Sequence, residues 1–279
     1  MTSCQPRAKS PFTWSCGPSS SKSSAPILCH GPLAIPGMWL LTLPVGLVLD
    51  SGGNGDGFFA AFAIMSFDAL APHYRWMEFV LAGNKLQRDR TAFLSQVGHR
   101  QNALLVGEGN GRFLLECRRS LQHARVTCMD ASDRMLALAR ERAQNSGLGS
   151  PQIQFIHADA LDWTPPVGAF DLVVTHYVLD CFRPDQLKQV VATLAKAAAP
   201  DATWLLADFQ VPATGLRRCR ALIIHRLMYL FFRLATRLPA RHLTGPDSFL
   251  EEHGFTLRDR RLSEWGLLHS DRWERVPPA

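Results

Sequence analysis

One stretch of the chain, residues 103–116, limits the fold more than any other. It reads ALLVGEGNGRFLLE, which is a short apolar run, three glycines at alternate positions and the start of a helical pattern. The apolar run fits a strand that is buried on both faces of a parallel sheet. Gly107, Gly109 and Gly111 let the backbone approach a ligand closely, because no Cβ stands in the way. The loop N–H groups and the positive end of the helix dipole then face that ligand.

The glycine spacing disagrees with the common dinucleotide fingerprint G-x-G-x-x-G. Its third glycine would fall at Arg112 or at Leu114, depending on where the pattern starts. A nicotinamide-dependent oxidoreductase is therefore disfavoured, although an ordinary glycine turn in an α/β protein stays open at this point. The spacing G-x-G-x-G resembles motif I of the class I S-adenosylmethionine-dependent methyltransferases.

Length and composition allow one α/β domain with extensions, or at most two small domains. The chain has 279 residues, of which 47% are hydrophobic and 19% charged, and a formal net charge of +6 without a lysine-rich tail. Nucleic-acid binding is therefore not indicated. The seven cysteines are scattered without a C-x-x-C pair, and the ten histidines form no metal-ligand set. We expect a reducing, cytoplasmic compartment and no bound metal.

Residues 1–64 lack the pattern of a folded enzyme. They are rich in Ser, Pro and Gly, and their apolar run 33–49 is interrupted by Pro36 and Pro44. A signal peptide normally places its apolar core nearer the N-terminus, and a spanning helix prefers fewer prolines. We expect either a disordered tail or upstream sequence translated in error, with the natural protein starting at Met65.

Residues 65–100 read as helices that precede the glycine strand. One helix begins after Ser66, and a second spans Lys85 to Val97. The phrase FDALAPHY resembles the segment before the core of many methyltransferases, where an aromatic side chain closes over the cofactor. By that resemblance we expect Tyr74 to reach the cofactor; the alternative is that it only packs.

Two further strands end in acidic residues. The strand at 125–129 leads to Asp130, close to the roughly 20 residues after the glycines that are typical of an acid binding ribose hydroxyls. The strand at 153–156 leads to Asp159 and Ala160. In the methyltransferases that the sequence resembles, the acid at this second position takes the adenine amino group. The backbone N–H of the next residue takes a ring nitrogen.

Residues 170–182 are predicted to form a fourth strand and the loop that follows it. Thr175, His176 and Asp180 lie near its carboxyl end, the edge at which open α/β sheets bind ligands. We expect Thr175 to contact the cofactor and His176 to act as general base, because the ordinary pKa of histidine lies near neutrality. Asp180 and Asp208, which follows a fifth strand, would orient His176 or bind substrate. The alternative is that His176 contacts the cofactor or has a structural role.

The series of strand ends makes the methyltransferase resemblance specific. It covers roughly Ser66 to Pro212, with the core at 101–212. It implies a Rossmann-like three-layer α/β sandwich whose seven-stranded, mostly parallel sheet ends in an antiparallel C-terminal hairpin. It also implies S-adenosylmethionine as cofactor, held by Gly107, Glu108, Gly109, Gly111, Asp130, Asp159, Ala160, Thr175 and Tyr74. The family usually has an acid where this chain has Leu105, and Glu108 is the nearest substitute, so the group that holds the methionine amine stays open.

Residues 213–279 complete the predicted fold. The span 217–238 is a basic amphipathic helix with Arg218, His225, Arg226, Arg233 and Arg237 near one face. It could lie on an anionic membrane surface or cover a lipid-like substrate, whereas the plainer interpretation packs it on the sheet. Residues 255–273 form the hairpin.

The sequence thus predicts an in-line methyl transfer to an unidentified acceptor that is small or lipid-like. We expect a cytoplasmic enzyme, with peripheral membrane contact through 217–238 as a further expectation. The alternative is a non-catalytic, S-adenosylmethionine-binding regulator associated with a membrane, motivated by Leu105 and the basic helix. The acceptor, the atom that is methylated and the oligomeric state cannot be read from the sequence.

Overall fold

The computed structural model describes residues 84–149, 151–236 and 243–275. The predictions on residues 1–64, on the helix after Ser66 and on Tyr74 lie outside these residues. One seven-stranded sheet has the order β3-β2-β1-β4-β5-β7-β6. Its strands are β1 Asn102–Val106, β2 Arg125–Asp130, β3 Ile153–His157, β4 Phe170–His176, β5 Ala198–Phe209, β6 Phe255–Ser263 and β7 Leu268–Arg275.

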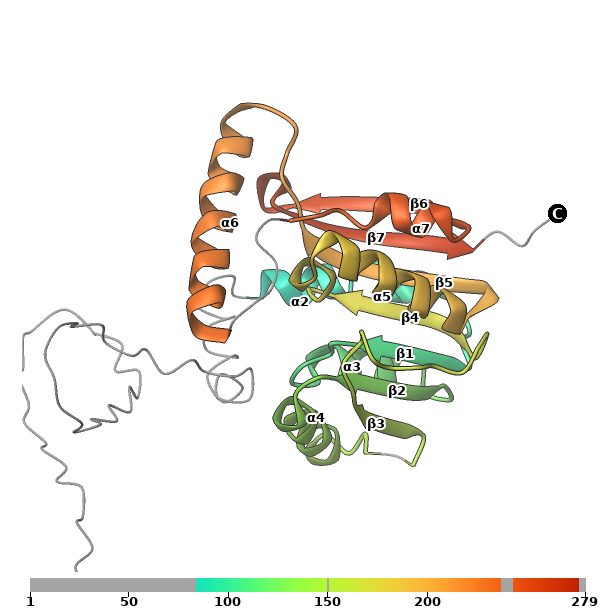
Figure 1. The fold of residues 1–279 in the computed structure, drawn as a ribbon. Helices are drawn as coiled ribbons and strands as arrows, with labels where there is room; N and C mark the ends of the chain where they lie inside the picture. Colours follow the sequence, from blue (N-terminus) through green and yellow to red (C-terminus); the bar gives the residue numbers. More distant parts are fainter. Residues whose placement is uncertain (1–83, 150, 237–242, 276–279) are drawn as a thin grey trace, which may run out of the picture. The chain divides into compact units, whose positions relative to one another are not determined.

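The pairing of the strands confirms the predicted sheet. Neighbours from β3 to β5 are parallel, whereas β7 is antiparallel to both β5 and β6 (Figure 1). The strand order reverses at β1: β2 and β3 follow on one side of it, whereas β4 and β5 follow on the other. In open α/β sheets this is the place where a crevice for a ligand forms, outside the carboxyl ends of the strands.

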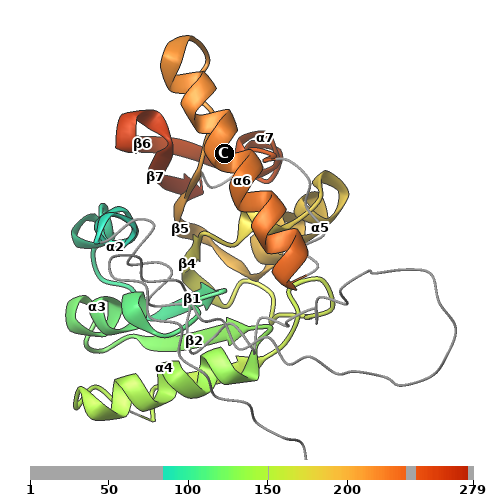
Figure 2. The ribbon, with the colours of Figure 1, turned by 90° about the vertical axis from the view of Figure 1, so that its left-hand side faces the viewer.

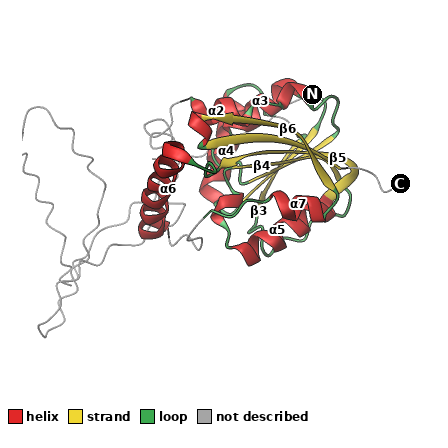
Figure 3. Cartoon of the chain, turned by 90° about the horizontal axis from the view of Figure 1, so that it is seen from above, coloured by secondary structure: helices red, strands yellow, loops and turns green. Residues whose placement is uncertain are grey.

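Helices cover both faces of the sheet, as the three-layer prediction requires. Figure 3 shows α2, α3 and α4 on one side and α5 and α7 on the other. Their bounds are α2 Lys85–Arg90, α3 Arg112–Ser120, α4 Asp133–Asn145, α5 Pro184–Ala197 and α7 Asp247–Glu252. Ser132 caps α4 as its position predicts, because its Oγ accepts a hydrogen bond from the N–H of Met135 at 3.2 Å.

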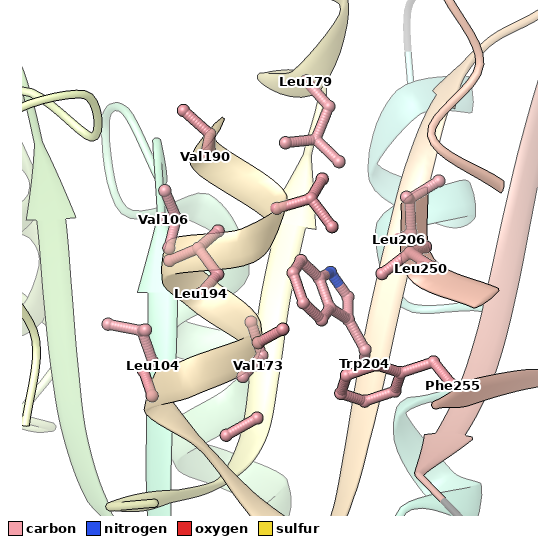
Figure 4. Packing of buried hydrophobic residues seen from close by; sticks show 14 of the residues in the cluster. Leu104, Val106, Val173, Leu179, Val190, Leu194, Trp204, Leu206, Leu250 and Phe255 are labelled. Carbon is pink, nitrogen blue, oxygen red and sulfur yellow. The ribbon is translucent and has the colours of Figure 1, made fainter. Parts of the chain in front are cut away.

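The strands feed two apolar cores by alternating their side chains. Ala103 and Leu105 of β1 join the cluster beneath α3, whereas Leu104 and Val106 join the cluster beneath α5. Figure 4 shows the second cluster, in which the ring of Trp204 meets that of Phe255 edge to face at 5.3 Å. The continuous apolar run of β1 is thus explained by burial on both faces.

One predicted boundary differs from the structure. The helix expected at Lys85–Val97 is α2 followed by a separate 3₁₀ turn, Leu94–Gln96. At the other end of the core, α5 ends at Ala197 and β5 begins directly at Ala198, which pairs with Phe170. Local pattern could not show this pairing between segments distant in sequence.

The long helix α6, Gly215–Thr236, stands across the carboxyl ends of the parallel strands (Figures 1 and 3). Its inward stripe is Ala221, His225 and Tyr229, all at most 5% exposed. Arg218 falls within about 20° of His225 around the helix but is exposed near the N-terminal end, and Arg226 is exposed to one side of the inward stripe, so these two arginines do not share the burial of His225. Within the residues that the structure describes, we find no helix with the length and hydropathy needed to cross a bilayer.

Candidate functional site

The glycine loop between β1 and α3 has two glycines that serve packing and one that borders open space. All three have positive φ, at +63° for Gly107, +67° for Gly109 and +80° for Gly111. A Cβ at Gly107 would lie 2.6 Å from a methyl group of Val178, and one at Gly111 would lie 2.8 Å from the Cα of Ala139. A Cβ at Gly109 would meet nothing within 4 Å. The middle glycine therefore leaves room for a ligand to approach the backbone.

The carboxylate of Asp130 ties this loop to the end of β2. Its Oδ2 accepts a hydrogen bond from the N–H of Gly109 at 2.8 Å, and its Oδ1 accepts one from the N–H of Ser132 at 2.9 Å. These two bonds fix the carboxylate of Asp130 beside the open glycine.

Glu108 caps the following helix. Its Oε1 accepts hydrogen bonds from the N–H groups of Phe113 and Leu114, both at 2.9 Å. These two N–H groups therefore do not face a ligand, contrary to the prediction for the start of this helix. Burial raises the pKa of Glu108 to about 7, although the helix amides and the charge of Arg90 act in the opposite direction.

The end of β3 places Asp159 next to this group. The N–H of Ala158 donates to the carbonyl of Asp130 at 3.1 Å, which joins the ends of β2 and β3. Asp159 is exposed, and its Oδ1 accepts a hydrogen bond from the N–H of Leu161 at 2.9 Å, whereas Ala160 is buried. The structure therefore brings Asp130, Asp159 and Ala160 to one edge, as predicted.

Thr175 lies in the core instead. Its side chain is fully buried, and its Oγ1 accepts a hydrogen bond from the indole Nε1 of Trp204 at 2.8 Å. Thr175 and His176 are successive residues of β4, so their side chains point to opposite faces of the sheet. The predicted cofactor contact finds no support in this position.

His176 is buried at 6% exposure on the other face. Its ring meets the ring of Phe113 edge to face at 4.6 Å. Burial, and then the charge of Arg90, hold the pKa of His176 well below its ordinary value. The ring is therefore neutral and weakly basic, so the reason for choosing it as general base does not hold.

Two acidic side chains, Asp180 after β4 and Asp208 near the end of β5, are buried together. Asp180 is 8% exposed and Asp208 is 2% exposed. Burial raises the pKa of Asp180 to about 6. Burial and then the charge of Asp180 raise the pKa of Asp208 well above its ordinary value. Both carboxyl groups therefore keep a proton to higher pH than an exposed aspartate does.

The comparisons with known proteins agree with this architecture. Residues 103–201 match the family model of a methyltransferase domain. A demethylmenaquinone methyltransferase of Thermus thermophilus is 28% identical over 151 residues, which are 53% of this chain and 66% of that protein. A structure of an O-methyltransferase family protein from Burkholderia thailandensis is similar with a TM-score of 0.61 at 15% identity, covering 77% of this chain and 64% of that one. The chain thus spans slightly less than two thirds of each of these two relatives.

Together with the seven-stranded sheet, the match of residues 103–201 supports a class I S-adenosylmethionine-dependent methyltransferase domain in the core of this chain. A further similar structure is the N-methyltransferase NodS from Bradyrhizobium japonicum in complex with S-adenosylhomocysteine. Its TM-score is 0.52 at 20% identity, and the match covers 70% of this chain and 90% of NodS. At identities of 15% and 20%, these structural matches show a shared fold.

The residues of the methyltransferase domain fit the cofactor of its family, S-adenosylmethionine. The open space at Gly109 suits the close approach of the methionine part. The fixed carboxylate of Asp130 suits a ribose diol, and the exposed Asp159 suits an amino group. Leu105, at the usual acid position, is 1% exposed in the core beneath α3. The methionine amine therefore has no partner at Leu105.

Three residues near the site were missed by sequence reasoning. The guanidinium of Arg90 in α2 lies 5.1 Å from the ring centroid of Tyr177, which directly follows β4 and has a strained φ of +55°. His225 of α6 is 5% exposed, and among the described residues neither ring nitrogen has a hydrogen-bond partner. The Tyr229 hydroxyl donates to the carbonyl of Asp180 at 3.1 Å. The spacing of Ala221, His225 and Tyr229 by four was the available signal for the last two.

Proposed function

We propose that the chain transfers the methyl group of S-adenosylmethionine to a small or lipid-like acceptor that binds beside Asp180 and Asp208. The observation that carries the proposal is the pairing of Gly109, open to a ligand, with the fixed carboxylate of Asp130 where the strand order turns. The relative from Thermus thermophilus is named for demethylmenaquinone, which supports lipid-like quinones as acceptors to test first.

Each part of the cofactor has proposed partners in this chain. The loop from Gly107 to Gly111 would hold the methionine part, Asp130 the ribose, and Asp159 with the N–H of Ala160 the adenine. When bound, S-adenosylmethionine supplies an electrophilic methyl group for in-line transfer. Alignment of the acceptor by the protein can contribute on the order of 7–11 kcal/mol to lowering the barrier.

Asp208 is the proposed proton acceptor of the reaction. An acceptor that reacts through a hydroxyl or an amine must lose a proton, and a base works best with a pKa near the working pH. Burial raises the pKa values of both carboxyl groups above the ordinary aspartate value and lowers that of His176 below its own ordinary value. In this proposal His176 shapes the site as a neutral ring, and Asp180 tunes the pKa of Asp208.

A cytoplasmic location is also a proposal. The described cysteines Cys117, Cys128, Cys181 and Cys219 are all free thiols. Free thiols are typical of a reducing compartment.

Calorimetric titration with S-adenosylmethionine and S-adenosylhomocysteine tests the cofactor, with NAD as the negative ligand. We expect micromolar binding of the first two, lowered at least tenfold by Asp130→Asn. Asp133→Asn is the matched control, because Asp133 is an exposed acid three residues further on. Binding of NAD alone, or equal loss in both variants, would contradict the proposal. Release of S-adenosylhomocysteine with an acceptor panel then tests catalysis, and cofactor binding without turnover would favour a non-catalytic binding protein.

A further inference from the structure

The outer face of α6 carries apolar side chains that the fold does not bury. Four of them, here called the outer stripe, are Leu216, Ile223, Leu227 and Leu230, with exposed fractions of 89%, 61%, 62% and 52%. At 3.6 residues per turn these four fall within a sector of about 60°. The sector lies opposite the inward stripe that contains His225 and Tyr229. Figure 2 shows α6 in orange, standing in front of the sheet.

The charge on this helix has one sign. From Gly215 to Thr236 the sequence has five arginines and neither aspartate nor glutamate. Arg226 is exposed and lies next to the outer stripe on the helix circumference. An arginine can lay its aliphatic stem along an apolar surface while its guanidinium reaches a polar layer. An apolar stripe with a cationic border is typical of helices that lie in a membrane interface.

An exposed tryptophan joins α6 from the turn between β6 and β7. Trp265 is 72% exposed, and the guanidinium of Arg220 lies 5.7 Å from its ring centroid. Arg220 also donates to the carbonyl of Glu264 at 3.1 Å. Glu264 and Trp265 have φ angles of +50° and +64°, an unfavourable conformation for residues with a Cβ. The backbone thus holds a large aromatic ring in an exposed position beside a basic helix, and tryptophan is enriched where apolar and polar layers meet.

We propose that the outer stripe, Arg226 and Trp265 form a docking surface for a bilayer that contains anionic phospholipids, with α6 lying parallel to the membrane. Charge complementarity favours this occupant over a second copy of the chain, because two such helices face to face would bring arginines together. The inward side of α6 contacts Asp180 through Tyr229, so docking would place the acceptor end of the site next to the lipid. The docking surface does not depend on the proposed function.

Vesicle sedimentation with the full chain tests the apolar part of this surface. The probes are vesicles of phosphatidylcholine with and without phosphatidylglycerol. We expect binding to the anionic vesicles, weakened roughly tenfold or more by Ile223→Glu or Leu227→Glu. Val167→Glu is the matched control, because Val167 is 83% exposed between β3 and β4 and outside this surface. It should bind like the unchanged protein. Calorimetric titration with S-adenosylhomocysteine checks that each variant keeps its fold.

A charge reversal tests the electrostatic part. Arg226→Glu should lower binding to anionic vesicles roughly tenfold or more, and Arg125→Glu, an exposed arginine at the start of β2, should lower it far less. Absence of vesicle binding, or equal losses in the surface variants and their controls, would overturn the proposal. So would a dimer of the unchanged protein that Ile223→Glu converts to a monomer in light scattering, because a second copy would then cover the stripe.

Discussion

At the residue scale, burial acts in opposite directions on the acids and bases at the carboxyl edge of the sheet. Removing water disfavours the charged form of any side chain. It therefore lowers the pKa of His176 and raises the pKa values of Asp180 and Asp208. The environment that weakens the histidine as a base strengthens the carboxylates. These opposite directions are the reason why the proposed function assigns the proton to Asp208 rather than to His176.

Asp208→Asn should separate the catalytic and structural effects of this pair. Turnover should fall by about 10²–10⁴-fold, the usual contribution of a general base. Cofactor affinity should stay unchanged. An asparagine Oδ1 can still accept the hydrogen bond that Asp208 takes from the N–H of Phe209 at 2.7 Å. Release of S-adenosylhomocysteine and calorimetry measure the two quantities.

Stability gives a second readout for Asp208→Asn. The pKa of Asp208 is raised in the folded protein, so the folded state binds more protons, and stability falls as pH rises above the ordinary aspartate value of 3.8. Asp208→Asn should therefore gain stability relative to the unchanged protein as pH rises above 3.8 in urea unfolding. Asp201→Asn, at an exposed position of the same strand, should show no such gain. A gain in both variants, or in neither, would contradict the assignment.

Glu108→Gln tests the raised pKa of the residue that caps α3, again through the dependence of stability on pH. The pKa of Glu108 is raised from 4.5 to about 7, so its ionisation costs stability as pH rises between these values. A shift of this size corresponds to roughly 3 kcal/mol. Urea unfolding should show the unchanged protein losing about that much relative to Glu108→Gln from pH 4.5 to pH 7. Glu141→Gln, at an exposed position of α4, should track the unchanged protein. Parallel stability curves for Glu108→Gln and the unchanged protein would refute the raised pKa.

At the element scale, different glycines of the loop serve packing and binding. Alanine at either Gly109 or Gly111 would have a left-handed φ, which costs about 1–2 kcal/mol. Only Gly111→Ala adds a clash, with its Cβ 2.8 Å from the Cα of Ala139. We expect Gly111→Ala to lose roughly 1–3 kcal/mol more stability than Gly109→Ala. Gly109→Ala should instead weaken binding of S-adenosylhomocysteine at least tenfold. Urea unfolding measures the stability of the two variants, and calorimetry measures their affinity for S-adenosylhomocysteine. Normal affinity in a folded Gly109→Ala would place the cofactor elsewhere.

The elements also show what sequence reasoning can reach. The strand ends at Asp130 and Asp159 were predictable, because each follows a short apolar run before a turn or a helix. The orientation of α6 was not, because its apolar residues surround the helix and the inward stripe contains alanine, histidine and tyrosine. The contacts of Arg90 with Tyr177 and of Tyr229 with Asp180 join segments far apart in the chain. Periodicity within one segment has no information about such contacts.

At the scale of the whole molecule, a buried ion pair fastens the hairpin that completes the sheet. Asp271 in β7 is 1% exposed. Arg260 in β6 donates to its two oxygens at 2.8 and 2.7 Å, and Nδ1 of His269 donates at 3.0 Å. Burial alone would raise the pKa of Asp271, but these hydrogen bonds hold it below its ordinary value. The carboxylate is therefore charged and depends on its partners.

Removing the arginine should destabilise the whole fold. Arg260→Met leaves a buried carboxylate without its cation and should cost about 3–5 kcal/mol of unfolding free energy at pH 7. Arg258→Met is the control, because Arg258 pairs with Glu274 at an exposed position and such pairs contribute about 0–1 kcal/mol. Because the pKa of Asp271 is lowered in the folded protein, its stabilising charge is lost as pH falls below the ordinary value of 3.8. The deficit of Arg260→Met should therefore shrink in acid, where its Asp271 can take up a proton. Urea unfolding across pH measures this, and an equal cost in both variants would show that the pair does not fasten the hairpin.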